Sequence, residues 1–214
     1  MNMRNKSCWL MLYARGFKLV PMWLLVLNLL LAPTFAKSAE PPQPLPAETL
    51  SQIRFDQRIN AQVPLDLAFR DDMGRRVALS QYFDRKPVVL VLGYYQCPML
   101  CTLVLNGLVA ALEDVKWTAG TEFEVVDVSI NPLETPPLAA AKKSTYLRSY
   151  GRAGAAAGWH FLTGDASSIK QLADMVGFHY AYDPVSKQYA HPSGVIVLTP
   201  KGKVSQYVFG VTYP

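Results

Sequence analysis

A run of apolar residues leads directly into two cysteines and then into a helical pattern, and this succession limits the chain to few architectures. Residues 87–94, PVVLVLGY, are mostly β-branched or apolar, which is typical of a strand buried on both faces of a sheet. Cys97 and Cys101 follow, and apolar residues at helical spacing continue beyond them, Leu103 and Val115 included. The order predicts an α/β fold with both thiols between the end of a core strand and the start of a helix.

Strand and helix patterns alternate along the rest of the chain. We expect a hairpin of strands 65–69 and 76–79 turned at 71–74, a strand at 123–130, a helix at 136–150, a strand at 159–162, a helix between Asp165 and Gly177, and a hairpin of strands 194–199 and 204–209. Thr135 and Pro136 suit the N-cap and the first position of their helix, and Asp165 suits the next N-cap. This order predicts a thioredoxin-like α/β sandwich with an N-terminal β-hairpin.

The start of the chain has the composition of a signal peptide. Basic residues precede the apolar run 20–32, and residues 34–36, Thr-Phe-Ala, offer the small side chains that a signal peptidase reads. A membrane-spanning helix needs about 20 apolar residues, whereas this run is shorter and contains Pro21 and Asn28. We therefore expect a signal peptide at residues 1–36, with an uncleaved anchor as the alternative. The protein is then exported, and is either periplasmic or anchored at the periplasmic face of the inner membrane.

The segment after this leader divides into a linker and one domain. Residues 37–50 are rich in proline, which predicts a linker. Residues 51–214 contain all the strand and helix patterns and are expected to form the thioredoxin-like domain. The chain stops directly after a predicted strand, where thioredoxin-like sheets usually receive a closing helix, so we expect a domain truncated at its carboxyl end.

Most of the net charge of +5 belongs to the leader. Arg4, Lys6, Arg15 and Lys18 are four of the 21 basic residues, and the others nearly balance the 16 acidic ones. The domain therefore lacks the basic excess that is typical of nucleic-acid-binding proteins. We expect no nucleic-acid partner, and membrane association only through an uncleaved leader.

Cys8 lies in the leader, so Cys97 and Cys101 are the only thiols expected in the mature chain. Two cysteines do not form the disulfide framework of a small secreted domain, and a bridge across so short a loop stabilises little. Two chemical roles remain, disulfide exchange and binding of a soft metal. Residues four apart in a helix have Cβ atoms about 5–6 Å apart, whereas a disulfide prefers about 3.8 Å. The spacing therefore favours a metal without excluding a bridge.

His191 is the candidate third ligand, because it lies in a loop directly before a predicted core strand, and in this fold that loop faces the thiols. His160 and His179 are expected to be packing or surface residues. Two thiolates with one imidazole suit Cu(I) and also accommodate Cu(II). Zinc is the rival, because Cys₂His plus water is a catalytic zinc pattern, although no acid or base partner for hydrolysis stands out. Met99 could lend a thioether, but we expect it to pack or to be exposed.

Four segments, in this order, resemble the SCO/SenC family of copper-delivery proteins. They are GYYQCPMLC at 93–101, Asn-Pro-Leu-Glu-Thr at 131–135, WHFLTG at 159–164, and His191 ahead of GVIVLTPKGK at 194–203. The resemblance covers residues 50–214. It implies a thioredoxin-like fold, export or membrane tethering, and copper held by Cys97, Cys101 and His191. It also implies a part in assembling the dinuclear copper centre of cytochrome c oxidase.

The chain departs from the usual pattern of that family near the predicted site. Asn131 and Glu134 occupy positions where the family often has aspartates. Tyr189 and Ala190 precede the histidine, where the family often has an aspartate. The groups around the metal ligands are therefore expected to differ, and with them the copper affinity or the choice of partner.

The leading hypothesis is a metallochaperone that delivers copper to, or keeps reduced, the copper centre of a respiratory cytochrome c oxidase. Its partners are then the copper-centre subunit of the oxidase, a copper donor and a thiol reductant, and it binds and delivers rather than catalyses. The first alternative is a periplasmic thiol–disulfide oxidoreductase without physiological copper, with Cys97 and Cys101 as redox-active thiols. The second is a thiol peroxidase, for which Thr102 is present but no arginine is close in sequence.

Overall fold

The structure is a computed structural model, and it describes residues 47–97 and 99–213. These residues belong to one compact unit, Pro44–Pro214. The predicted signal peptide at 1–36 and most of the predicted linker lie outside the described residues. No helix within the described residues is long and apolar enough to cross a membrane.

Helices and strands alternate through the described unit. The helices are α2 (Ala47–Gln52), α3 (Leu100–Asp114), α4 (Pro136–Tyr150) and α5 (Ala166–Met175), with 3₁₀ turns η1 (Leu79–Tyr82) and η2 (Ala155–Ala157). The strands are β1 (Arg54–Phe55), β2 (Ala68–Arg70), β3 (Arg76–Ala78), β4 (Val88–Gly93), β5 (Glu124–Ser129), β6 (Trp159–Leu162), β7 (Phe178–His179), β8 (Ala181–Asp183), β9 (Gln188–Ala190), β10 (Gly194–Leu198) and β11 (Val204–Phe209).

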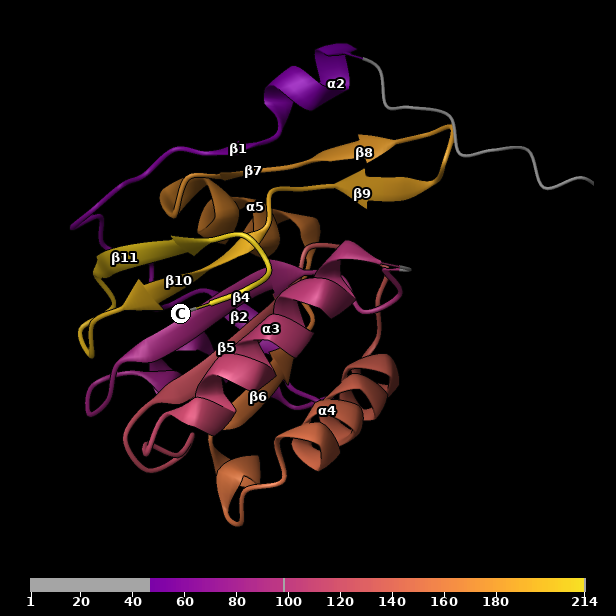
Figure 1. Cartoon of the computed structure of the whole chain (residues 1–214). Helices are drawn as coiled ribbons and strands as arrows, with labels where there is room; N and C mark the ends of the chain where they lie inside the picture. Colours follow the sequence, from indigo (N-terminus) through magenta and orange to yellow (C-terminus); the bar gives the residue numbers. More distant parts are fainter. Residues whose placement is uncertain (1–46, 98, 214) are drawn as a thin grey trace, which may run out of the picture. The chain divides into compact units, whose positions relative to one another are not determined.

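A five-stranded sheet with the order β11-β10-β4-β5-β6 forms the centre of this unit (Figure 1). Strands β4, β5 and β6 are parallel, β10 is antiparallel to β4, and β11 is antiparallel to β10. Helices α3 and α4 pack on one face of the sheet, while α5 and the β2–β3 hairpin pack on the other. This mixed α/β sandwich confirms the predicted thioredoxin-like fold class.

Strand β4 is buried on both faces, as its continuous apolar sequence predicts. Leu90 and Leu92 belong to the apolar core on the α5 side, and Val91 belongs to the core on the α3–α4 side. Because alternate residues of a strand point to opposite faces, an apolar side chain is needed at every position. The strand therefore anchors the segment that follows it to the middle of the domain.

The helix boundaries follow the signals in the sequence. The Asp165 carboxylate accepts a hydrogen bond from the Ser168 N–H at 2.9 Å and caps α5. Gly177 follows α5 with φ of +63°, and a Cβ there would lie 1.9 Å from the Asp56 carbonyl oxygen, so only glycine fits. Helix α4 begins at Pro136 directly after Thr135, as predicted, although the Thr135 side chain makes no capping hydrogen bond.

The predicted N-terminal hairpin is present but begins later than residue 65. Strands β2 and β3 pair in register, with Arg70 opposite Arg76. The carbonyl oxygens of Leu65 and Leu67 instead accept hydrogen bonds from Ser80 and Leu79 at the start of η1. The segment 65–67 therefore lies against η1 and not in the hairpin.

Two other parts of the fold differ from the expected pattern. Helix α3 buries Val104, Leu108 and Leu112 as its apolar spacing predicts, but it also buries Leu105 and Val109. Leu103 is 45% exposed, and Val115, directly after the helix, is 37% exposed. Apolar residues surround most of this helix, so their spacing alone does not fix which face is buried. Residues 178–190 form β7 and the β8–β9 hairpin, which we did not predict, because strands of two or three residues are too short to show an alternating pattern.

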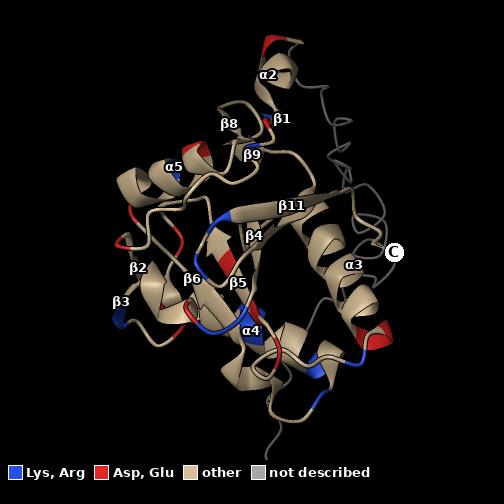
Figure 2. Ribbon diagram, turned by 90° about the vertical axis from the view of Figure 1, so that its left-hand side faces the viewer, with Lys and Arg blue, Asp and Glu red and all other residues tan. Residues whose placement is uncertain are grey.

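Charged residues are spread over the described elements and do not gather on one of them (Figure 2). Helix α3 is uncharged until Glu113 and Asp114 at its carboxyl end. The first turn of α3, which carries Cys101, therefore contains no charged side chain.

Candidate metal centre

Cys97 and Cys101 lie where the chain passes from β4 into α3. The Cys97 N–H donates to the Tyr94 carbonyl at 3.2 Å, which closes a tight turn, and Cys101 is the second residue of α3. A Cβ at Gly93 would lie 3.2 Å from the Cys101 sulfur, closer than most such contacts. The glycine at the end of β4 thus allows the backbone to approach the thiol.

His191 joins the two cysteines from a distant part of the sequence. One ligand atom from each of Cys97, Cys101 and His191 lies within 4.8 Å of the others. The closest pair is the Cys101 sulfur and the His191 Nε2, 2.9 Å apart. The structure therefore brings together the three residues that the sequence singles out. Within the described part of the chain, no other group of three His, Cys, Asp or Glu residues has this geometry.

The topology of the sheet explains why His191 lies beside the thiols. Strand β10 is antiparallel to β4, with Ile196 opposite Leu90. The residues ahead of β10 therefore lie at the carboxyl end of β4, which is where Cys97 follows. The loop between β9 and β10 holds His191 at that end, and the residue is 5% exposed.

The hydrogen bond on the far side of the His191 ring sets its tautomer. The Nδ1 atom lies 2.9 Å from the Pro192 carbonyl oxygen. A carbonyl oxygen only accepts hydrogen bonds, so Nδ1 carries the proton and donates it. The Nε2 lone pair is then free and faces the sulfurs, which is the form that binds a metal.

The two thiols have unequal affinities for a proton. A hydrogen bond from the Cys101 thiol lowers the pKa of Cys97 against the opposing effect of burial, and the nearby His191 ring and the backbone amides of Cys101 and Met99 lower it further. The Cys101 N–H lies 3.3 Å from the Cys97 sulfur. The same thiol–thiol hydrogen bond, together with burial, raises the pKa of Cys101. Cys97 is therefore the thiolate of the pair, which suits both metal binding and nucleophilic attack.

Aromatic rings enclose the histidine side of the cluster. The centroids of Tyr94 and Phe178 lie 6.2 Å and 5.9 Å from that of His191. Tyr189, one of the departures from the family pattern, packs edge-on against Tyr94 at 5.8 Å. Burial raises the pKa of the Tyr94 phenol, and the nearby Cys97 and Cys101 sulfurs raise it further. The wall around the imidazole is therefore apolar and uncharged at neutral pH.

The Glu134 carboxylate binds the backbone of the loop that carries Cys97. One of its carboxylate oxygens accepts from the Gln96 N–H at 2.7 Å. The other accepts from the Tyr95 N–H at 2.7 Å and from the Ser129 hydroxyl at 2.6 Å. The side chain is buried. In the sequence Glu134 is visible only as a departure from the family pattern, because its partners are mainly backbone amides, which leave no trace in a sequence.

Asp127 is a buried acid that the sequence analysis did not single out. It lies on β5, and its Oδ2 atom has no hydrogen-bond partner among the described residues. Burial raises its pKa to about 8, the nearby Lys142 lowers it, and Glu134 raises it. Asp127 and Cys101 both line a small cavity beneath the first turn of α3. At neutral pH the carboxyl group is therefore mostly protonated.

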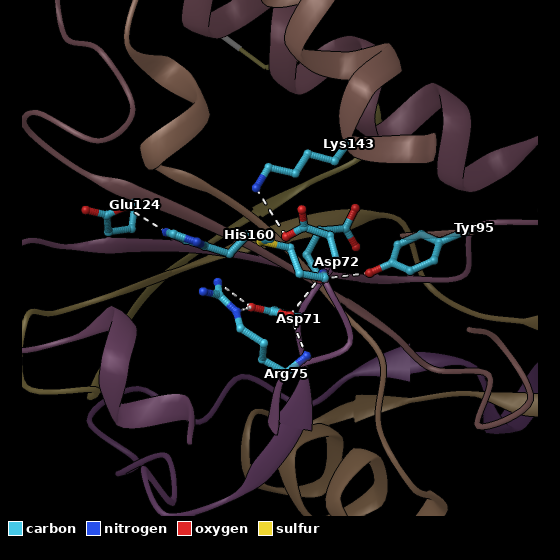
Figure 3. A network of polar contacts seen from close by, with 9 residues as sticks. Asp71, Asp72, Arg75, Tyr95, Glu124, Lys143 and His160 are labelled. Atoms are coloured by element: carbon cyan, nitrogen blue, oxygen red, sulfur yellow. Dashed lines mark hydrogen bonds and ion pairs between the residues drawn. The ribbon is translucent and has the colours of Figure 1, made fainter. Parts of the chain in front are cut away.

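The remaining histidines are engaged elsewhere. His160 points to Glu124, with 3.0 Å between Nε2 and the carboxylate, within the polar network of Figure 3. Its ring also packs against Tyr82, with centroids 4.3 Å apart. The Nε2 atom of His179 lies 2.7 Å from the Asp56 carboxylate. Both are packing or surface residues, as expected from the sequence.

Two other residues considered for the site have distinct positions. Met99 is 68% exposed and its side chain is therefore on the surface. The Thr102 hydroxyl accepts from the Lys142 ammonium at 3.5 Å, and the Thr102 carbonyl accepts from the Tyr146 hydroxyl at 3.5 Å. Thr102 thus connects α3 to α4, which gives no support to a role in a peroxidase site.

The donor set favours a soft metal ion. Two sulfurs and one imidazole nitrogen converge, and none of the three belongs to a carboxylate, which hard cations prefer. Thiolate and imidazole together suit Cu(I), which tolerates a low coordination number. The cluster can therefore hold a copper ion without a further ligand from the chain.

Comparisons with known proteins show what this chain is similar to. A family model described as SCO1/SenC matches residues 57–212. The comparison with curated proteins by sequence found no match. Among solved structures, one from Aquifex aeolicus VF5 is similar with a TM-score of 0.63 and 24% identity, over 73% of this chain and 88% of that chain.

Two further structures share the fold. ScoI of Arabidopsis thaliana, solved with copper bound, has a TM-score of 0.56 and 20% identity, over 67% of this chain and 85% of its own. BsSco, a member of the Sco family of cytochrome c oxidase assembly proteins, has a TM-score of 0.55 and 18% identity, over 75% and 90%. At these identities the likeness shows that this chain shares the thioredoxin-like fold of the Sco structures, and it shows no more than the fold.

Proposed function

The chain belongs to the SCO1/SenC family, and with that as the premise we propose that it is a metallochaperone that delivers copper to, or keeps reduced, the copper centre of a respiratory cytochrome c oxidase. One observation carries the proposal. The ligand atoms of Cys97, Cys101 and His191 already lie within 4.8 Å of one another. The fold has therefore already offset the entropy of bringing these distant residues together before copper binds.

The choice of copper over zinc rests on the surroundings of the cluster. A catalytic zinc site needs an open position for water and a general acid or base nearby. Here the three ligands are largely buried, and the rings of Tyr94 and Phe178 lie against the imidazole. A buried, soft, three-donor set fits the storage and transfer of Cu(I) better than hydrolysis. The copper-bound ScoI structure of Arabidopsis thaliana supports the same choice.

A thiol–disulfide oxidoreductase is the second candidate, and a specific observation favours it. Both cysteines are free and lie close together in space. The pKa of Cys97 is lowered mainly by the hydrogen bond from Cys101. This pairing of one thiolate with one thiol is what attack on a foreign disulfide and its resolution require. Such exchange needs only the sulfurs, whereas copper binding also needs His191.

Metal analysis of protein purified under reducing conditions tests the proposal most simply. We expect one copper per chain in the reduced protein, and little or none after replacement of either Cys97 or Cys101 by alanine, since Cu(I) loses half of its thiolates. Oxidation of the pair to a disulfide should also prevent copper binding. Full copper content in Cys101→Ala protein would show that the two cysteines do not share a site.

The place and partners of the protein form part of the same proposal. We propose that it is exported and acts in the periplasm, or at the periplasmic face of the inner membrane, and that its partners are the copper-centre subunit of the oxidase, a copper donor and a thiol reductant. The apolar leader and the location of respiratory copper centres support this. Cell fractionation would oppose the proposal if the protein remained in the cytoplasm.

A further inference from the structure

The buried position of the three ligands raises the question of how copper reaches them. Cys97 is 9% exposed, Cys101 4% and His191 5%. Copper(I) that arrives on another molecule remains bound to soft ligands until new ones replace them. A donor too large to enter the cluster therefore needs a soft atom at the surface to which it can pass the ion.

The thioether sulfur of Met99 is such an atom. Its side chain is 68% exposed, and the residue lies between the two cysteines in the sequence. The residue is the N-cap of α3, the helix that carries Cys101, and its carbonyl accepts a hydrogen bond from the Leu103 N–H at 3.1 Å in the first turn. The backbone of Met99 is thus fixed to the metal loop while its thioether is in solvent.

The sulfur of Met99 distinguishes this residue from other exposed apolar residues. Leu103 and Leu133 are 45% and 84% exposed, so apolar side chains are not rare on this surface, and single exposed ones need no special reason. Only Met99 among these three carries a sulfur. A thioether is a soft ligand that binds Cu(I), and it needs no deprotonation to do so.

We propose that Met99 is the capture ligand of the site, which takes Cu(I) from a donor at the surface, passes it to Cys97 and Cys101, and receives it again on delivery. The inference rests on the proposed copper function. Copper stays Cu(I) throughout. A bond to a donor ligand is exchanged for one to the Met99 sulfur, and that bond is exchanged for bonds to the cysteine sulfurs, while the remaining thiol proton passes to the buffer.

The test is the rate at which copper moves, measured without oxygen by the absorbance of the Cu(I)–bicinchoninate complex. Reduced protein takes copper from this complex, and excess bicinchoninate takes it back. We expect Met99→Leu, which keeps the size of the side chain but removes the sulfur, to slow both directions by about tenfold. The ratio of the two rates, and hence the affinity, should stay the same, because a transient ligand is absent from the final state.

Met73 provides a matched control. It is 73% exposed in the β2–β3 turn, and Met73→Leu should leave both rates unchanged. Unchanged rates in Met99→Leu would overturn the proposal, as would a loss of affinity in that variant, which would make Met99 a permanent ligand. Failure of the unaltered protein to take copper from the complex would instead oppose the copper function itself, so the two failures are distinguishable.

Discussion

His191 is the residue that separates copper binding from thiol exchange. Its Nε2 lone pair faces the Cys101 sulfur at 2.9 Å, while Nδ1 is held by the Pro192 carbonyl. We predict that His191→Ala weakens Cu(I) binding at least about tenfold, which corresponds to ~1.4 kcal/mol. Formation and reduction of the Cys97–Cys101 disulfide should be largely unchanged, because sulfur exchange does not require the imidazole.

Competition with a Cu(I) chelator and thiol counting measure these two properties on the same preparation. His179→Ala is the matched control, because it removes an imidazole that pairs with Asp56 outside the cluster. In cells that depend on a copper oxidase, His191→Ala should behave like Cys97→Ala. Normal oxidase assembly with His191→Ala, but none with Cys97→Ala, would favour the reductase.

Asp127 predicts a specific dependence of stability on pH. Burial raises its folded-state pKa to about 8 from an ordinary value of 3.8. The folded state therefore holds this proton more tightly than the unfolded state does. Below pH 4 both states are protonated and the group has no effect. Between about pH 4 and pH 8 the unfolded state ionises first, so stability falls by several kcal/mol, at about 1.4 kcal/mol per pH unit.

Asp127→Asn removes this titration while keeping the shape of the side chain. We predict that the difference in unfolding free energy between the variant and the unaltered protein grows in favour of the variant as the pH rises through this window. Denaturant unfolding at pH 5, 6, 7 and 8 measures the difference. Asp84→Asn, at an exposed residue paired with Lys201, should show no such gain. A difference that is independent of pH would contradict the buried, mostly protonated carboxyl group.

At the scale of elements, Glu134 connects two loops at the same edge of the sheet. It follows β5, and its carboxylate accepts from Tyr95, Gln96 and Ser129. In Glu134→Gln the amide nitrogen would face one of these donors and leave it without a partner. We predict a loss of about 1–3 kcal/mol in unfolding free energy and, because the loop carries Cys97, a fall of about 10- to 100-fold in copper affinity.

Glu122→Gln is the control for this substitution. Glu122 also accepts a backbone hydrogen bond, from Thr118 at 2.8 Å, but on an exposed loop. It should change neither stability nor copper affinity appreciably. Wild-type copper affinity in Glu134→Gln would mean that the Tyr95–Gln96 turn holds its shape without the carboxylate.

The elements differ in how far the sequence could predict them. Signals within each segment were sufficient for β4, α4 and the β10–β11 hairpin. They are the continuous apolar run of β4, the Thr135–Pro136 start of α4, and the two apolar runs of the hairpin. Strands β8 and β9, with three residues each, were not predictable, because they are too short to show an alternating pattern, although Tyr182 and Tyr189 pair across them. The buried face of α3 was ambiguous for the opposite reason, an excess of apolar residues.

The candidate site shows the same division. The spacing of Cys97 and Cys101 identifies them in the sequence, and Met99 lies between them. The proximity of His191, 90 residues beyond Cys101, follows only from the antiparallel pairing of β10 with β4. Glu134 and Asp127 act through backbone amides and burial, and neither has a pattern in the sequence.

At the scale of the whole molecule, the sheet explains how the fold brings the three soft donors together. The carboxyl ends of the parallel strands β4 and β5 and the start of the antiparallel strand β10 meet at one edge. Cys97 and Cys101, Glu134, and His191 each follow or precede one of these strands. The sheet therefore holds the three soft donors together at that edge, and the exposed Met99 lies between the two cysteines in the sequence.

X-ray absorption at the copper edge of the reduced, copper-loaded protein tests the central claim most directly. We predict Cu(I) with two sulfur neighbours and one nitrogen neighbour. The nitrogen should be lost in His191→Ala and a sulfur in Cys97→Ala or Cys101→Ala. Copper surrounded by nitrogen or oxygen alone, or a spectrum unchanged by these substitutions, would contradict a shared site of Cys97, Cys101 and His191.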